Sequence, residues 1–110
     1  MKIQTSELKR VTLFEISGRV DSTNAVELGT VFNTAIDAGR AQIVVDLSAV
    51  EYMSSAGLRE LVSALKKVKR GTGDLRLAAP SARVQEVLEL AGLDSVFQIF
   101  QNQVEAVGSF

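Results

Sequence analysis

The chain has 110 residues, of which 46% are hydrophobic and 23% are charged, and this balance predicts one compact domain spanning residues 1–110. Cysteine and histidine are absent, which excludes thiol nucleophiles, zinc sites of the Cys/His kind and imidazole general bases. The formal net charge of -1 argues against nucleic acid as a partner. No apolar stretch is long enough for a signal peptide or a membrane span, so we expect a cytoplasmic protein without a membrane span.

The first half of the sequence predicts a hairpin, a helix and a central strand. Many β-branched residues in the range 2–20, interrupted by the polar pair 9–10, predict two antiparallel strands, the second ending at Gly18. Residues 21–24 offer side-chain oxygens that could cap a helix closing near Gly39. The uninterrupted apolar run over residues 43–47 predicts a strand that is buried on both faces at the centre of the sheet.

The second half continues the alternation of helices and strands. A connecting segment after residue 47 leads to a helix from about Ser55 to Arg70, and its start is expected within two residues of Ser55. Further strands are predicted at 75–79 and 96–100, with a helix between them that opens at 80–81 and stops at Gly92, and a short helix at about 103–107. The predicted fold class is α/β, a mixed five-stranded sheet with about four helices in the order ββαβαβαβα.

The segment from residue 44 to residue 59 carries most of the functional information. A buried strand leads here into a helix that begins with two hydroxyls, Ser54 and Ser55, followed by the small residues Ala56 and Gly57. Function in α/β sheets usually lies where a strand ends and a helix begins, and the free amides of the first helical turn suit an anion. Either serine could instead do no more than cap the helix. No base is available to make one a catalytic nucleophile, but a kinase needs only an exposed hydroxyl.

Residues 45–59 resemble the signature of the STAS domain of bacterial anti-sigma factor antagonists, and residues 18–21, 75–80 and 84–93 resemble other parts of that family. The resemblance implies a regulatory module rather than an enzyme, without catalytic residues, metal or cofactor. Such a module binds an anti-sigma factor with a serine-kinase fold and so frees a sigma factor, until that kinase phosphorylates the module. A phosphatase that removes the phosphate is also implied.

The resemblance assigns roles to particular residues. The phosphoacceptor lies two positions before the Gly-Leu pair, which makes it Ser55, and Asp21 matches an acidic residue near the acceptor. Many members have Asp immediately before the acceptor, whereas this chain has Ser54 there. The predicted partner surface consists of Asp21, Ser22, Ser54, Ser55, Gly57 and Leu58.

Other patterns in the sequence point to weaker alternatives. Residues 71–73 resemble the start of a dinucleotide-binding loop, but Arg76 stands in place of the last glycine and the segment follows a helix. The cations at residues 66–70 are favoured by the helix dipole without any ligand, and the carboxylates are scattered over separate elements. Two other functions stay open: a STAS subunit of a stress-signalling or lipid-transport assembly, or a small-ligand module with a groove beside the second helix.

Overall fold

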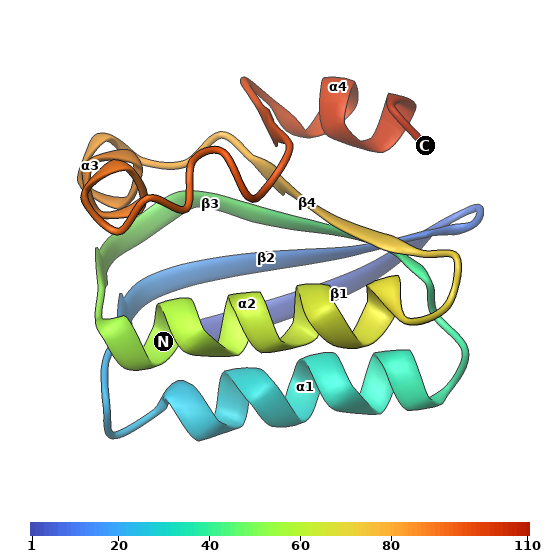
Figure 1. The fold of residues 1–110 in the computed structure, drawn as a ribbon, viewed down its shortest axis with the longest axis horizontal. Helices are drawn as coiled ribbons and strands as arrows, with labels where there is room; N and C mark the ends of the chain where they lie inside the picture. Colours follow the sequence, from blue (N-terminus) through green and yellow to red (C-terminus); the bar gives the residue numbers. More distant parts are fainter.

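A mixed sheet of five strands is the frame of the structure, a computed structural model that describes residues 1–110 (Figure 1). β1 (Lys2–Leu8) and β2 (Val11–Val20) form the predicted antiparallel hairpin. β3 (Gln42–Met53), β4 (Asp74–Ala78) and β5 (Ile99–Phe100) continue the sheet in parallel with β2. The spatial order β1-β2-β3-β4-β5 places β3 at the centre, which confirms the prediction.

Helices lie on both sides of this sheet. α1 (Ala25–Asp37) and α2 (Ser55–Lys69) run next to each other over one face (Figure 1). α4 (Gln103–Gly108) covers part of the opposite face, and α3 (Ala82–Leu90) packs against the second half of β3. The predicted α/β class and element order are confirmed, and α2 begins at Ser55 as expected. None of the helices combines the length and the apolar content needed to cross a membrane.

The apolar core has a large part under α1 and α2 and a smaller part under α4. In the large part the rings of Phe14 and Phe32 meet edge to face, with 5.3 Å between their centroids. β3 contributes Ile43 and Val45 to the large part and Val44 to the small one. This central strand is therefore covered on both faces, as its unalternated apolar sequence predicts.

β3 is longer than predicted, because the chain stays paired with β2 beyond Leu47 where the sequence suggested a connecting segment. The pairing register shifts between Asp46 and Ala49, and the amide of Ser48 donates to Oδ1 of Asp46 at 2.8 Å. Such a bulge lets a strand continue through polar residues. Gly18 marks a second register shift with a φ of 89°, so it bends β2 and does not end it as predicted.

β5 is shorter than predicted, because only Ile99 and Phe100 pair with β4. The amides of Val96 and Phe97 both donate to the carbonyl of Leu93, so these two residues belong to a turn that follows α3. Phe97 nevertheless lies in the core. Its burial explains the apolar pattern that suggested a strand, since a buried turn residue and a strand residue look alike in sequence.

Candidate functional site

The predicted site residues meet at the edge of the sheet where β2 and β3 end. These neighbouring parallel strands end at the paired residues Val20 and Met53, and the amide of Ser54 donates to the carbonyl of Val20 at 2.8 Å. The loop of residues 21–24 and the serine pair therefore leave the sheet side by side. α1 and α2 both begin at this edge (Figure 1). A strand end facing two helix starts is the usual place for function in an α/β fold.

The two serines of this edge have different environments. Ser54 is the N-cap of α2, and its Oγ accepts a hydrogen bond of 3.3 Å from the amide of Gly57. Ser55 is the first residue of the helix, is exposed, and makes no side-chain hydrogen bond within the chain. The sequence left open which serine caps the helix, and the structure assigns that role to Ser54. The hydroxyl of Ser55 is therefore free to react or to be bound.

Gly57 and Leu58 lie beneath the site and are both buried. A Cβ added at Gly57 would clash with Sδ of Met53 and stand 2.7 Å from Cγ1 of Val20, so a larger residue would displace the side chains on which the first turn of α2 rests. Leu58 belongs to the main core. These two predicted contact residues therefore shape the surface from below, and most of the exposed area comes from residues such as Ser22 and Ser55.

The loop before α1 is held by its own side chains. Oδ1 of Asp21 accepts from the amide of Thr23 at 2.9 Å and from its hydroxyl at 2.5 Å. Oδ1 of Asn24 accepts from the amide of Asp21 at 2.9 Å, and its Nδ2 donates to the carbonyl of Arg19 at 2.9 Å, so this side chain fastens the loop and does not cap the helix. The Thr23 hydroxyl lowers the pKa of Asp21 below its ordinary value. A carboxylate of fixed position and charge thus lies at the same edge as the serines.

Two further residues are exposed at this edge, although the sequence did not predict them as part of the partner surface. Val26 is 73% exposed in the first turn of α1, and Arg59 is exposed four residues after Ser55 on α2. Residues four apart in a helix lie on the same side, so Arg59 neighbours Ser55. Each had a signal in the sequence. Val26 is an apolar residue off the buried stripe of its helix, and Arg59 is a cation one turn beyond the candidate acceptor.

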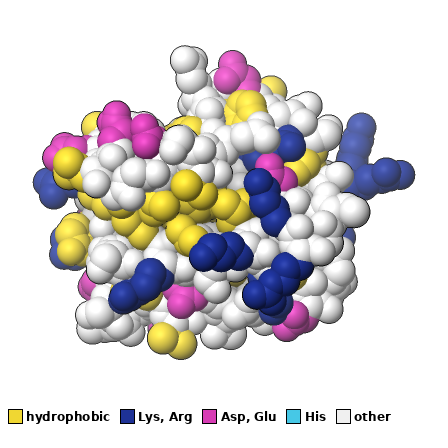
Figure 2. Space-filling model, viewed as in Figure 1, with side chains coloured by type: hydrophobic (Ala, Val, Ile, Leu, Met, Phe, Trp, Pro, Cys, Tyr) yellow, Lys and Arg dark blue, Asp and Glu magenta, His cyan; other side chains and the backbone are white.

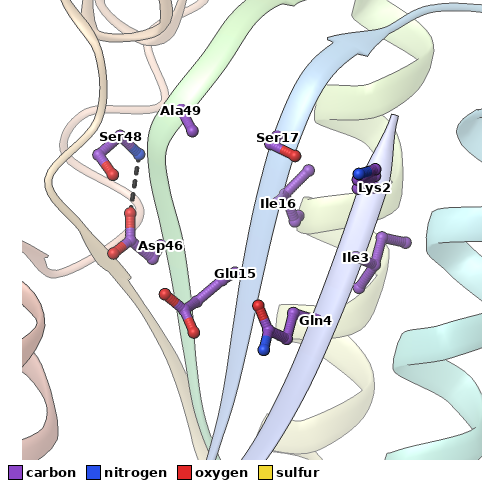
Figure 3. A pocket seen from close by; sticks show the side chains of 9 residues that line it. All are labelled: Lys2, Ile3, Gln4, Glu15, Ile16, Ser17, Asp46, Ser48 and Ala49. Atoms are coloured by element: carbon purple, nitrogen blue, oxygen red, sulfur yellow. Dashed lines mark hydrogen bonds between the residues drawn. The ribbon is translucent and has the colours of Figure 1, made fainter.

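A separate hollow of about 390 Å³ lies on the open face of the sheet, where β1, β2 and β3 carry polar side chains (Figure 3). The carboxylates of Glu15 and Asp46 lie close together there and both accept from Nε2 of Gln103 in α4, at 2.9 and 2.5 Å. No group of three or more acidic side chains is arranged to hold a metal ion. We interpret this acidic pair as an anchor for α4.

The family of the chain follows from comparison with known proteins. The STAS domain model matches residues 2–106. The chain belongs to the STAS domain family. This STAS domain is 30% identical over 110 residues to BtrV of Bordetella bronchiseptica, a candidate anti-sigma factor antagonist, with 100% of the chain and 95% of BtrV covered. It is 27% identical over 97 residues to the anti-sigma-F factor antagonist RsfB of Mycobacterium tuberculosis, with 88% and 79% covered. The resemblance noted in the sequence to anti-sigma factor antagonists is confirmed.

Two solved structures show the same fold. The anti-sigma factor antagonist SpoIIAA in its unphosphorylated form superposes on this STAS domain with a TM-score of 0.85 at 20% identity, covering 96% of this chain and 93% of the other. The phosphorylated form of the Bacillus protein SpoIIAA superposes with a TM-score of 0.79 at 19% identity, covering 98% of each chain. At this identity the likeness establishes the shared fold.

Proposed function

We propose that this STAS domain is an anti-sigma factor antagonist that is switched by phosphorylation of Ser55. In its unphosphorylated form it binds an anti-sigma factor with a serine-kinase fold, and this sequestration releases the sigma factor. The observation that carries the proposal is the free, exposed hydroxyl of Ser55 at the start of α2, next to a neighbour, Ser54, whose hydroxyl is engaged as a cap. The similarity to BtrV and RsfB supports the proposal, because both relatives are described as anti-sigma factor antagonists. It is also supported by the fold shared with SpoIIAA, whose phosphorylated form has been solved.

The proposed contact surface surrounds the acceptor. Its exposed groups are the hydroxyls of Ser22 and Ser55, the apolar side chain of Val26 and the cation of Arg59. The ionised Asp21 adds a negative charge. A kinase must cover the hydroxyl that it modifies, so the complex that sequesters the anti-sigma factor and the complex that phosphorylates the STAS domain share this surface. A phosphatase that removes the phosphate from Ser55 would restore binding. The chain itself contributes no catalytic residue to these steps.

The acceptor is identified by comparing the two serines. Incubated with its cognate kinase and ATP, the wild-type protein is expected to gain one phosphate, and Ser55→Ala is expected to gain none. Ser54→Ala should still be modified, but more slowly, because it loses the cap of α2, which typically costs about 1 kcal/mol of stability. Intact-protein mass spectrometry measures the phosphate. If Ser55→Ala still gained the phosphate and Ser54→Ala did not, the acceptor would be Ser54. A domain modified at neither serine would favour the alternative of a structural subunit in a larger assembly.

The charge of Asp21 is expected to contribute to partner binding. Asp21→Lys should weaken binding of the anti-sigma factor about tenfold, because it reverses a charge at the edge of the proposed interface. Isothermal titration calorimetry measures the affinity. Glu105→Lys makes the same change of charge on an exposed residue of α4, on the opposite face of the sheet, and serves as the matched control. Equal affinities of the two variants would remove the loop of residues 21–24 from the interface.

A further inference from the structure

A groove runs along α2, between this helix and the turn that follows α3. It has a volume of about 480 Å³, and Ser55 lies at one end and Lys66 at the other. Lys66 follows Ser55 by eleven positions, which corresponds to roughly 16 Å of helix, or about three turns. Figure 2 shows this region as a band of apolar side chains bordered by lysine and arginine side chains over α2. The residues that line the groove are Ser55, Leu58, Arg59, Val62, Ser63, Lys66, Ala91 and Leu93.

The groove has an apolar floor and a positively charged rim. The apolar surface is provided by Leu58, Val62, Ala91 and Leu93. None of the residues that line the groove is acidic. Arg59 and Lys66 are both exposed, and neither forms an ion pair. By contrast, the next residue of the helix, Lys67, is paired with Asp37 of α1 at 2.7 Å. The two cations of the rim are therefore available to a partner.

We propose that this groove binds an acidic, amphipathic segment of the anti-sigma factor. The inference rests on the proposed function and adds to it a second contact region, which extends from Ser55 along α2 to Lys66. Apolar side chains of the segment would cover Val62 and Leu93, and its carboxylates would pair with Arg59 and Lys66 at the rim. This pattern of apolar anchors flanked by complementary charge is the usual way in which a groove beside a helix recognises an amphipathic segment.

Charge and position favour this occupant. The rim offers two unpaired cations and no carboxylate, which complements an acidic segment. The groove is also continuous with the proposed kinase-binding surface, because Ser55 belongs to both. The same geometry links the groove to the switch. A phosphate on Ser55 would lie one turn from Arg59 on the same side of α2, and the pair that they form would withdraw Arg59 from the carboxylates of the partner.

A pair of charge reversals on α2 tests the inference. Lys66→Glu is expected to weaken binding of the purified anti-sigma factor about tenfold and to reduce the dependence of the affinity on salt. Lys69→Glu is the matched control, because it reverses an exposed charge in the same last turn of α2 but outside the groove. Each variant is titrated by calorimetry at low and at high salt, after thermal melting has shown that the two unfold at similar temperatures. Equal affinities and salt dependences for the two variants would overturn the proposal.

Cross-linking locates the occupant directly. The chain has no cysteine, so Ser63→Cys introduces one thiol into the groove for a thiol-reactive photo-cross-linker. Irradiation of the complex is expected to join it to a peptide of the anti-sigma factor that contains both apolar and acidic residues, and mass spectrometry identifies that peptide. Gln4→Cys, on the exposed face of β1, is the control and should give no such product. A failure of Ser63→Cys to cross-link, or products from both variants alike, would contradict the inference.

The outcomes separate this inference from the proposed function. If the purified anti-sigma factors of the source organism do not bind the wild-type protein, the proposed function fails and the inference fails with it. If one binds and phosphorylates Ser55, but Lys66→Glu behaves like Lys69→Glu, only the inference fails. Vesicles containing phosphatidylglycerol test the competing occupant. Binding to vesicles that Lys66→Glu abolishes, without any effect on anti-sigma factor binding, would assign the groove to anionic lipid.

Discussion

Phosphorylation of Ser55 is expected to weaken the complex with the anti-sigma factor by about 100-fold or more, because it adds to the interface a charge that must be desolvated and that no group of the partner neutralises. The phosphate carries a charge of about -1.5 to -2 at neutral pH. It would stand where the partner must approach the start of α2, in the neighbourhood of the carboxylate of Asp21. Desolvation of the phosphate on binding and its repulsion of the carboxylates of the partner therefore both weaken the complex. Titration of the anti-sigma factor against the phosphorylated and the unmodified protein measures the loss.

The same modification is expected to leave the fold intact. Ser55 is exposed at the first position of α2, where the amides of the first turn lack partners further down the helix. An anion at such a position stabilises a helix by typically about 0.3–1 kcal/mol, so the unfolding midpoint should stay level or rise slightly. Calorimetric melting of the phosphorylated sample used for the titration checks this. Unfolding on phosphorylation would point to disruption of the domain, and undiminished binding would leave the switch without a mechanism.

Replacement of Phe32 by alanine is expected to lower the free energy of unfolding by about 3–5 kcal/mol. The side chain is fully buried, anchors α1 on the sheet, and meets the ring of Phe14 edge to face. Its loss leaves a cavity that the surrounding strands cannot fill. Because small domains are typically stable by only about 5–15 kcal/mol, such a change removes a large share of the total. Denaturation by urea, followed by circular dichroism, measures the effect.

The control for Phe32→Ala lies on the same helix. Val26→Ala removes an apolar side chain that is 73% exposed, so it should change the free energy of unfolding by less than about 0.5 kcal/mol. Val26 belongs to the proposed interface, so the same variant should weaken partner binding more than it weakens the fold. Comparable losses of stability for the two variants would mean that α1 is not held on the sheet through Phe32.

The elements with a strong periodic pattern could be predicted from the sequence, and those that depend on particular contacts could not. The apolar stripes of α1 and α2 and the unbroken apolar run in β3 reflect burial directly. The two helices and the central position of β3 in the sheet could therefore be predicted. The continuation of β3 beyond Leu47 depends on its pairing with β2 across a bulge at Asp46 and Ser48, which no periodicity reveals. Phe97 is buried from a turn, and its apolar character therefore suggested a strand that is absent there.

The candidate site was predictable in position but not in its details. The motif identified the start of α2 and placed both serines there, but only the structure distinguishes the capping hydroxyl of Ser54 from the free one of Ser55. The burial of Gly57 follows from its contact with strand ends that lie in two different elements. The groove is formed by residues of α2 and by Ala91 and Leu93, which are distant in sequence, so no local pattern could indicate it.

The close contact of Gly57 with Val20 and Met53 has a consequence for the thermodynamics of association. The first turn of α2 rests directly on the core, and the neighbouring loop is tied by the side chains of Asp21 and Asn24. The backbone of the binding surface is therefore preorganised before any partner arrives. Only long side chains such as Arg59 and Lys66 have conformational entropy left to lose, about 0.5–1.5 kcal/mol each on immobilisation. Free and bound forms should accordingly share one backbone conformation to within about 1 Å.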